Sequence, residues 1–222
     1  MSSKFVGSQI QLVFQVDYAT FTPDQFQQTL KEKGFQITPV QAVNPQGQPT
    51  QLQTFSKGNL IIFFVINPLN PSQIQIVFRV LNTVSLMSGP RGGTLLQDIK
   101  DILAGFNVVE DVISLISFNC NTKAAAAFDP VKGLTDGIKP TLMKKTMKAL
   151  GTNLNVTSLR LGTDFPLQMG MQLTLEPLSN DPKKQFFINV VFQTKDMKAL
   201  DTFVRGFGEN TIQDIIGALT NE

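Results

Sequence analysis

The sequence lacks histidine and tryptophan altogether, and its 222 residues include one cysteine and one tyrosine. Histidine is the commonest general base and the commonest metal ligand, so neither use of an imidazole is available here. The lone thiol of Cys120 excludes an intramolecular disulfide and a zinc site made of cysteine and histidine. A serine–lysine or paired-carboxylate mechanism stays open, but no spacing singles out its members. We therefore expect a protein that is not an enzyme, with no cofactor and no metal site.

Charged side chains are scarce as well, at 16% of the chain against about 25% in a typical globular protein. The shortfall is filled largely by glutamine, asparagine, threonine and serine, and the net charge is +2. We therefore expect a polar but weakly charged surface. The densest cationic group, Lys144, Lys145 and Lys148, is typical of a solvated helix face.

Long hydrophobic runs are missing too. The longest, from Leu60 to Ile66, is far shorter than the about 20 residues that span a bilayer. The first residues contain no apolar core of the length that a signal peptide needs. The sequence therefore predicts no membrane span and a cytoplasmic protein, and the single cysteine fits a reducing compartment.

Strand and helix patterns follow one another through the first half of the chain. Residues 9–18 alternate between apolar and polar side chains, which predicts a half-buried strand. A helix over 22–34 has proline in its first turn and stops at Gly34. Three further strand regions follow, at 36–43, at 50–67, where two strands are merged, and at 73–82. A closing helix at 94–106 completes this half.

The second half repeats this order of segments. The matching regions are a strand at 112–121, a helix at 139–151, strands at 156–161, 165–178 and 185–194, and a last helix at 210–219. A longer first connection, at 123–137, explains the shift between the two halves. We therefore predict an internally duplicated α+β protein with two repeats, 1–109 and 110–222, packed closely as one unit. Each repeat has the order β-α-β-β-β-β-α, and helices cover one face of its antiparallel sheet.

Alternation leaves the strands with a second face that is rich in uncharged amides. Its candidate binding residues are Gln9, Gln11, Gln15, Gln75, Arg79, Gln168, Gln172, Asn189 and Gln193. A solvated face is one interpretation, because antiparallel sheets commonly have one wet side. The other is a broad platform for a partner, because amides offer both hydrogen-bond donors and acceptors.

Two tandem modules of strand, helix, antiparallel strands and helix resemble the duplicated, saddle-like fold of the TATA-box-binding protein family. The resemblance covers the order of elements over nearly the whole chain and includes no specific motif. It implies a protein that binds DNA through its sheet face and inserts paired phenylalanines between base steps. The adjacent pairs Phe63-Phe64 and Phe186-Phe187 belong to different strands of the two modules, and no basic rim is apparent. The resemblance therefore carries the architecture and none of the contact residues.

The function expected from these features is that of a non-enzymatic binding or assembly protein that uses the amide-rich face. Its partner class is open between nucleic acid and protein. One alternative is a carrier that holds an apolar ligand in a cavity between sheet and helix. Another is a self-assembling structural protein, although Pro39, Pro68, Pro71 and Pro177 favour guarded strand edges.

Overall fold

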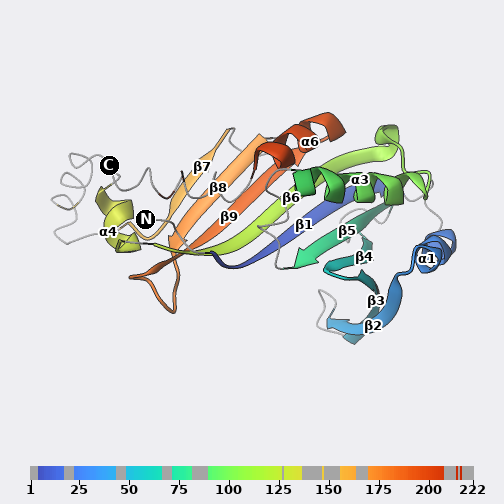
Figure 1. Ribbon diagram of the computed structural model, residues 1–222, viewed down its shortest axis with the longest axis horizontal. Coiled ribbons are helices and arrows are strands. Elements are labelled where there is room, and N and C mark those ends of the chain that lie inside the picture. Colours follow the sequence, from blue (N-terminus) through green and yellow to red (C-terminus); the bar gives the residue numbers. More distant parts are fainter. Residues whose placement is uncertain are drawn as a thin grey trace.

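The computed structural model describes residues 5–17, 23–43, 49–66, 72–81, 90–126, 128–136, 147, 156–163, 170–207, 214 and 216. Within these residues the fold is α+β, with one nine-stranded antiparallel sheet and four α-helices (Figure 1). In chain order the elements are β1 (Phe5–Asp17), α1 (Pro23–Glu32), β2 (Gln36–Val43), β3 (Pro49–Lys57), β4 (Leu60–Ile66), β5 (Gln73–Leu81), α3 (Pro90–Ala104), a 3-10 helix (Glu110–Val112), β6 (Ile113–Ala125), α4 (Pro130–Asp136), β7 (Leu159–Gly162), β8 (Gly170–Pro177), β9 (Gln185–Thr194) and α6 (Met197–Gly206).

The strand order across the sheet is β2-β3-β4-β5-β1-β6-β9-β8-β7. The first strand of the chain, β1, therefore lies in the interior, between β5 and β6. The pairing of β1 with β6 runs from Phe5 opposite Ala124 to Val16 opposite Ile113, so strands from both halves of the chain form one continuous sheet. The α+β class and the antiparallel pairing predicted from the sequence are confirmed.

Glycine produces two of the tight connections that the sequence pattern indicates. Gly34 has a φ of +82° directly after α1, and the backbone N–H of Phe35 donates to the carbonyl of Leu30. This is the hydrogen bond of a helix end closed by a left-handed glycine, and it confirms the predicted stop of the first helix. Gly58, with a φ of +58°, is the first residue of the two-residue turn between β3 and β4. That turn divides the merged strand pair into a hairpin.

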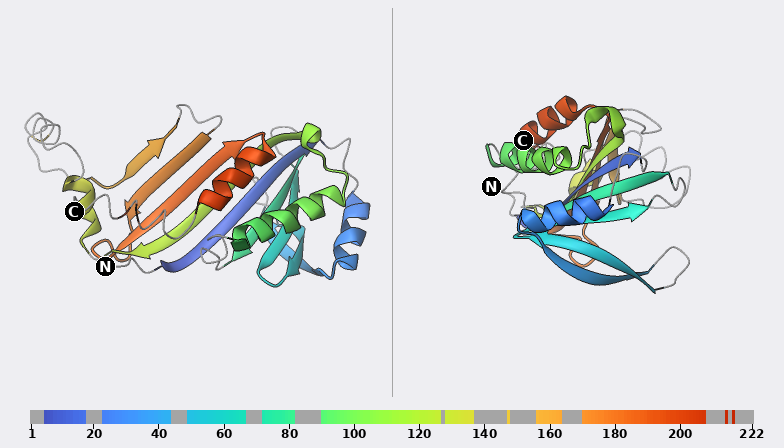
Figure 2. Two further views of the ribbon diagram at one scale, coloured as in Figure 1. Left: turned by 45° about the horizontal axis from the view of Figure 1, so that its top comes forward. Right: turned by 90° about the vertical axis from the view of Figure 1, so that its right-hand side faces the viewer.

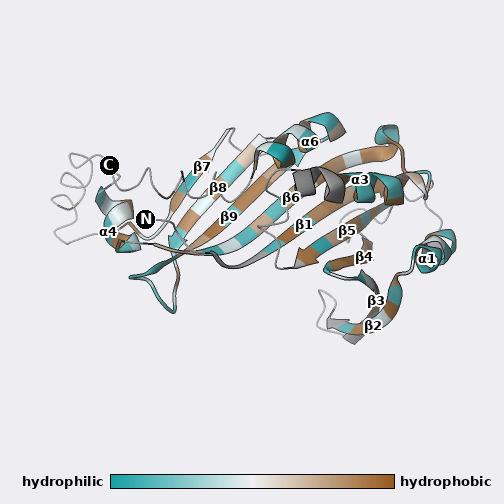
Figure 3. Ribbon diagram, viewed as in Figure 1, coloured by the Kyte–Doolittle hydropathy of each residue, from teal (hydrophilic) through white to brown (hydrophobic). Residues whose placement is uncertain are grey.

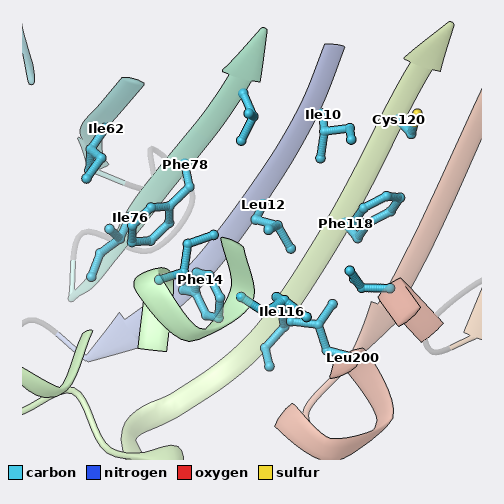
Figure 4. Packing of buried hydrophobic residues seen from close by; sticks show 14 of the residues in the cluster. Ile10, Leu12, Phe14, Ile62, Ile76, Phe78, Ile116, Phe118, Cys120 and Leu200 are labelled. Atoms are coloured by element: carbon cyan, nitrogen blue, oxygen red, sulfur yellow. The ribbon is translucent and has the colours of Figure 1, made fainter. Parts of the chain in front are cut away.

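The core lies between the sheet and its helices. On β1 the side chains of Ile10, Leu12 and Phe14 are completely buried, and they point to the same side as Phe118 of β6. Figure 4 shows these side chains projecting from neighbouring strands toward the helical segments, with Leu200 of α6 among them. In both views of Figure 2, α3 and α6 lie side by side on this face of the sheet.

A group of aromatic rings attaches α1 to the sheet. Phe26 is fully buried, and its ring packs edge-on against Phe55 of β3 and Phe64 of β4. The ring of Phe106, just after α3, lies against Phe26 as well. Phe26 thus joins two helices to the outer part of the sheet. Such pairs stabilise a core beyond the area that they bury.

Two parts of the second half differ from the sequence predictions. The longer connection predicted at 123–137 contains regular structure, because β6 continues to Ala125 and α4 follows from Pro130 to Asp136. The carboxylate of Asp129 accepts from the backbone N–H of Val131 and Lys132, which caps this helix. Directly after β9, α6 begins at Met197, where no helix was predicted. The predicted helices at 139–151 and 210–219 fall outside the described residues, except for residues 147, 214 and 216, which are helical.

One carboxylate links α3 to α6. Asp201 of α6 accepts from Arg205 one turn further along, and the ammonium of Lys100 on α3 lies 3.7 Å away. The hydrogen bond from Arg205 is the main reason why the pKa of Asp201 lies below its ordinary value, and Lys100 adds to it. The stability that this group contributes is therefore present above the unfolded carboxyl pKa and is lost as the pH falls through the lower folded pKa.

We expect Asp201→Asn to cause a small loss of stability at neutral pH and a smaller loss at an acidic pH, where the wild-type carboxyl also becomes protonated. Urea unfolding of both proteins at the two pH values measures this. Asp98→Asn is the matched control, because Asp98 is exposed on α3 and forms no ion pair with another described residue. A stability difference that is the same at both pH values would contradict the role of the Asp201 charge.

Candidate binding face

The amide-bearing side chains lie on the face of the sheet that points away from the core. Gln9, Gln11 and Gln15 alternate along β1 with its buried side chains, and each of the three is partly exposed. Figure 3 shows the same alternation as hydrophilic and hydrophobic segments following one another along the central strands. We call this side of the sheet the amide face, defined by Gln9, Gln11, Val13, Gln15, Gln75, Val77, Arg79, Ser117, Asn119, Asn121, Gln172, Thr174, Asn189, Val191 and Gln193.

The register brings eight of the nine predicted site residues onto this one face. Gln75 lies opposite Gln15, and Gln193 lies opposite Ser117 on the other side of the centre. The ninth residue, Gln168, lies outside the described residues. The structure therefore brings together residues of both halves of the chain that the sequence pattern placed on separate strands.

One row of the amide face crosses five strands. Starting from β5 it consists of Arg79, Gln11, Asn119, Val191 and Gln172, each directly opposite the next. Because neighbouring strands are about 4.8 Å apart, the row is about 19 Å long. Its members offer one guanidinium and three amides to any molecule that lies across the sheet.

A network of three asparagines links this row to the neighbouring one, in which Asn121 lies opposite Asn189. The Nδ2 of Asn189 donates to the Oδ1 of Asn121 at 2.7 Å and to the Oδ1 of Asn119 at 3.0 Å. With both of its hydrogens in use, Asn189 has only its carbonyl oxygen left, while the N–H groups of Asn119 and Asn121 are left to donate. This network fixes the orientation of the three amides at the centre of the sheet.

The sequence predictions missed Ser117, Asn119 and Asn121. The signal was present, because these residues alternate with Ile116, Phe118 and Cys120 along β6. The predicted polar face did not include this strand.

Arg79 lies in a setting that is unusual for an arginine. Its guanidinium carbon is 5.2 Å from the centre of the Phe63 ring, which also belongs to the amide face. Phe63 is 8% exposed and the adjacent Val77 is 2% exposed, so the side chain of Arg79 covers an apolar floor. Its Nε is buried and donates to no acceptor among the described residues.

Little charge surrounds this arginine. The two ion pairs found in the described part of the chain both involve Asp201, which belongs to α6 on the opposite side of the sheet. The other charged residues that the register places on the amide face are Asp17, Lys123, Arg160 and Glu176, toward the ends of their strands. Arg79 is therefore a lone cation next to the uncharged centre of the face.

The two adjacent phenylalanine pairs are split between the two sides of the sheet. Phe64 and Phe186 contribute to the core, whereas Phe63 and Phe187 follow the register of the amide face. They come from β4 and β9, so the members of the pairs do not occupy equivalent strands. This arrangement does not support the insertion of paired rings into a partner.

The thiol of Cys120 belongs to the core and not to the amide face. The side chain is completely buried, and burial raises the pKa of the thiol to about 12. The thiolate that would react or bind metal is therefore hardly populated at neutral pH. Within the described residues no group of three or more cysteine, aspartate or glutamate side chains is placed to hold a metal ion.

We expect the folded wild-type protein to remain unmodified by Ellman's reagent, and Gln11→Cys to react rapidly with one equivalent, because position 11 lies on the amide face. Cys120 is the internal control, since it becomes reactive only when urea unfolds the chain. Protection of both thiols in folded Gln11→Cys would show that position 11 is covered.

None of the helices that the structure describes is long and apolar enough to cross a lipid bilayer. Comparison with known proteins found no matching family model, no matching curated protein and no matching solved structure. The chemistry of the amide face is therefore the basis for any functional conclusion. That chemistry consists of hydrogen-bond donors and acceptors around one cation.

Proposed function

We propose that this chain is a non-enzymatic binding protein and that the amide face is its partner-binding surface. The observation that carries the proposal is the continuous row of Arg79, Gln11 and Asn119 across the middle of the sheet, on the side opposite α1, α3 and α6. A row of side-chain amides can donate to and accept from a partner without the desolvation cost of a charged surface.

The duplicated architecture is part of this proposal. Moving outward from β1, the order is β5, β4, β3 and β2, and moving outward from β6 it is β9, β8 and β7. In each half the first strand is central, the last strand lies next to it, and the earlier strands follow toward the edge. This order supports two repeats, 1–109 and 110–222, related by a pseudo-twofold axis between β1 and β6.

Such a pair of repeats has the element order of the TATA-box-binding protein family. On that ground we propose a saddle-like architecture that resembles the fold of that family. A buried thiol without a disulfide partner fits the reducing cytoplasm, which we propose as its location. A partner bound where the two repeats meet, at β1 and β6, would contact residues of both halves at once. The duplication would therefore contribute to binding.

A photo-reactive benzoylphenylalanine placed at position 11 tests the proposed surface in the cells that produce the chain. We expect a discrete cross-linked product from position 11, on the amide face. The matched control is the same residue at position 98, which is exposed on α3 on the opposite side. Products from position 98 alone, or the same products from both positions, would contradict the proposal.

A further inference from the structure

The setting of Arg79 calls for an acceptor that the described residues do not supply. A buried N–H without a hydrogen-bond partner costs free energy, and the cost is larger when the group is charged. The Nε of Arg79 is such a donor. Because this atom is closed to solvent, an acceptor from outside would meet the terminal nitrogens of the same partly exposed side chain. No carboxylate of another described residue forms an ion pair with this guanidinium.

The surroundings of Arg79 hold its guanidinium in place. The residues directly opposite it are Ile61 on β4 and Gln11 on β1, and the Phe63 ring lies beneath it. A guanidinium that lies over a ring has fewer orientations open to it, and its planar fork matches the two oxygens of a carboxylate. The ring and the apolar floor also reduce the competition from water.

We propose that Arg79 receives a carboxylate of a protein partner that lies extended across the amide face. This inference rests on the proposed function and names its partner class. The carboxylate forms the charged contact with Arg79, while Gln11 and Asn119 exchange hydrogen bonds with the main chain of the partner. The alternation of N–H and C=O along an extended chain suits side-chain amides, because each amide both donates and accepts.

The charges on the face favour a protein over a nucleic acid. Double-stranded DNA carries one negative charge for about every 1.7 Å of its axis, so its binding needs several cations along the path. The nearest cation in the other half of the amide face is Lys123, which lies two strands from Arg79 and four residues further along, or about 16 Å away. Arg160 lies five strands from Arg79, which corresponds to about 24 Å. One isolated guanidinium fits one carboxylate.

The test uses three pools of random ten-residue peptides, offered to the immobilised full-length protein. The first pool has glutamate at its central position and an amidated C-terminus. The second has glutamine there and an amidated C-terminus. The third has glutamine and a free C-terminal carboxylate, so the first and third pools separate a side-chain carboxylate from a terminal one. Retained peptides are counted by mass spectrometry for wild type, Arg79→Gln and the matched control Lys31→Gln, which removes an exposed cation from α1 on the opposite side of the sheet.

We expect wild type and Lys31→Gln to retain the first or the third pool at least about tenfold better than the second, the factor that a charged hydrogen bond provides. Arg79→Gln is expected to lose this preference while its circular dichroism spectrum and thermal unfolding stay close to those of wild type. Arg79→Lys keeps the charge without the fork, and we expect it to recover only part of the preference.

Equal retention of all three pools by wild type and Arg79→Gln would overturn the carboxylate inference and leave the amide face as the binding surface. Retention of no pool by wild type, together with a cross-linked product from position 11, would overturn the partner class and leave the proposed function standing. Displacement of the bound peptides by a 30-base-pair DNA duplex with higher affinity would also overturn it. Failure of both the peptide and the cross-linking experiments would remove the proposed function itself.

Discussion

Replacing Phe26 with alanine is expected to lower the free energy of unfolding by about 3–5 kcal/mol, the range found for large-to-small changes of a buried phenylalanine. The ring is completely buried and contacts Phe55, Phe64 and Phe106. Its removal leaves a cavity between α1, the β3–β4 hairpin and the end of α3. Because these contacts join segments that are far apart in the sequence, the neighbouring backbone cannot collapse into the space without losing other contacts.

Urea unfolding, followed by circular dichroism, measures this change. Phe26→Leu keeps most of the volume and is expected to cost less than the alanine variant. The surface control is Val109→Ala, because Val109 is 57% exposed and its truncation is expected to change stability by no more than about 0.5 kcal/mol. A cost below about 1 kcal/mol for Phe26→Ala would show that α1 does not depend on this ring.

The second large effect is expected for binding. Gln11→Glu places a carboxylate directly opposite Arg79, at a Cβ–Cβ distance of about 5 Å. The new carboxylate takes the position of the partner's carboxylate and also repels it. We expect an affinity about a hundredfold lower for acidic peptides selected on the wild-type protein, and no comparable change for neutral ones.

Fluorescence anisotropy with a labelled acidic peptide measures the affinity. Gln25→Glu is the matched control, since it adds the same charge to the exposed side of α1, on the opposite face of the sheet. Unchanged affinity in Gln11→Glu, or an equal loss in both variants, would show that the charge next to Arg79 is not what controls binding.

The sheet was predictable because its strands alternate with period two. The regular pattern from Gln9 to Val16 assigned the core side and the amide side of β1 correctly, and the bounds of β2 and β9 agree with the predicted ranges 36–43 and 185–194. The helix that ends before Gly34 was predictable as well, because proline at its start and glycine at its end act on the local backbone.

The elements that were missed depend on contacts between distant residues. Among them, α6 follows β9 after two residues, and its helical stripe of Met197, Leu200 and Val204 is short. The match to residues 94–106 predicted the last helix at 210–219, and α6 precedes that range. The adjacency of β1 and β6, which places Gln11 beside Asn119, is a matter of sheet order and cannot be read from alternation along one strand.

The Arg79 setting shows the same limit. The sequence placed this residue on the amide side of its strand, and that placement is confirmed. The stacking on Phe63 and the unpartnered Nε arise from β4 lying next to β5, a register that only the folded sheet supplies.

The most direct test of the amide face as a binding surface is a nuclear magnetic resonance titration of the labelled protein with a selected acidic peptide. We predict that the largest shifts occur at the side-chain amides of Gln11, Asn119 and Asn121 and at the Nε–H of Arg79. The backbone signals of α3 and α6 are predicted to remain in place. Shifts concentrated on those two helices, with the side-chain amides unmoved, would contradict the account.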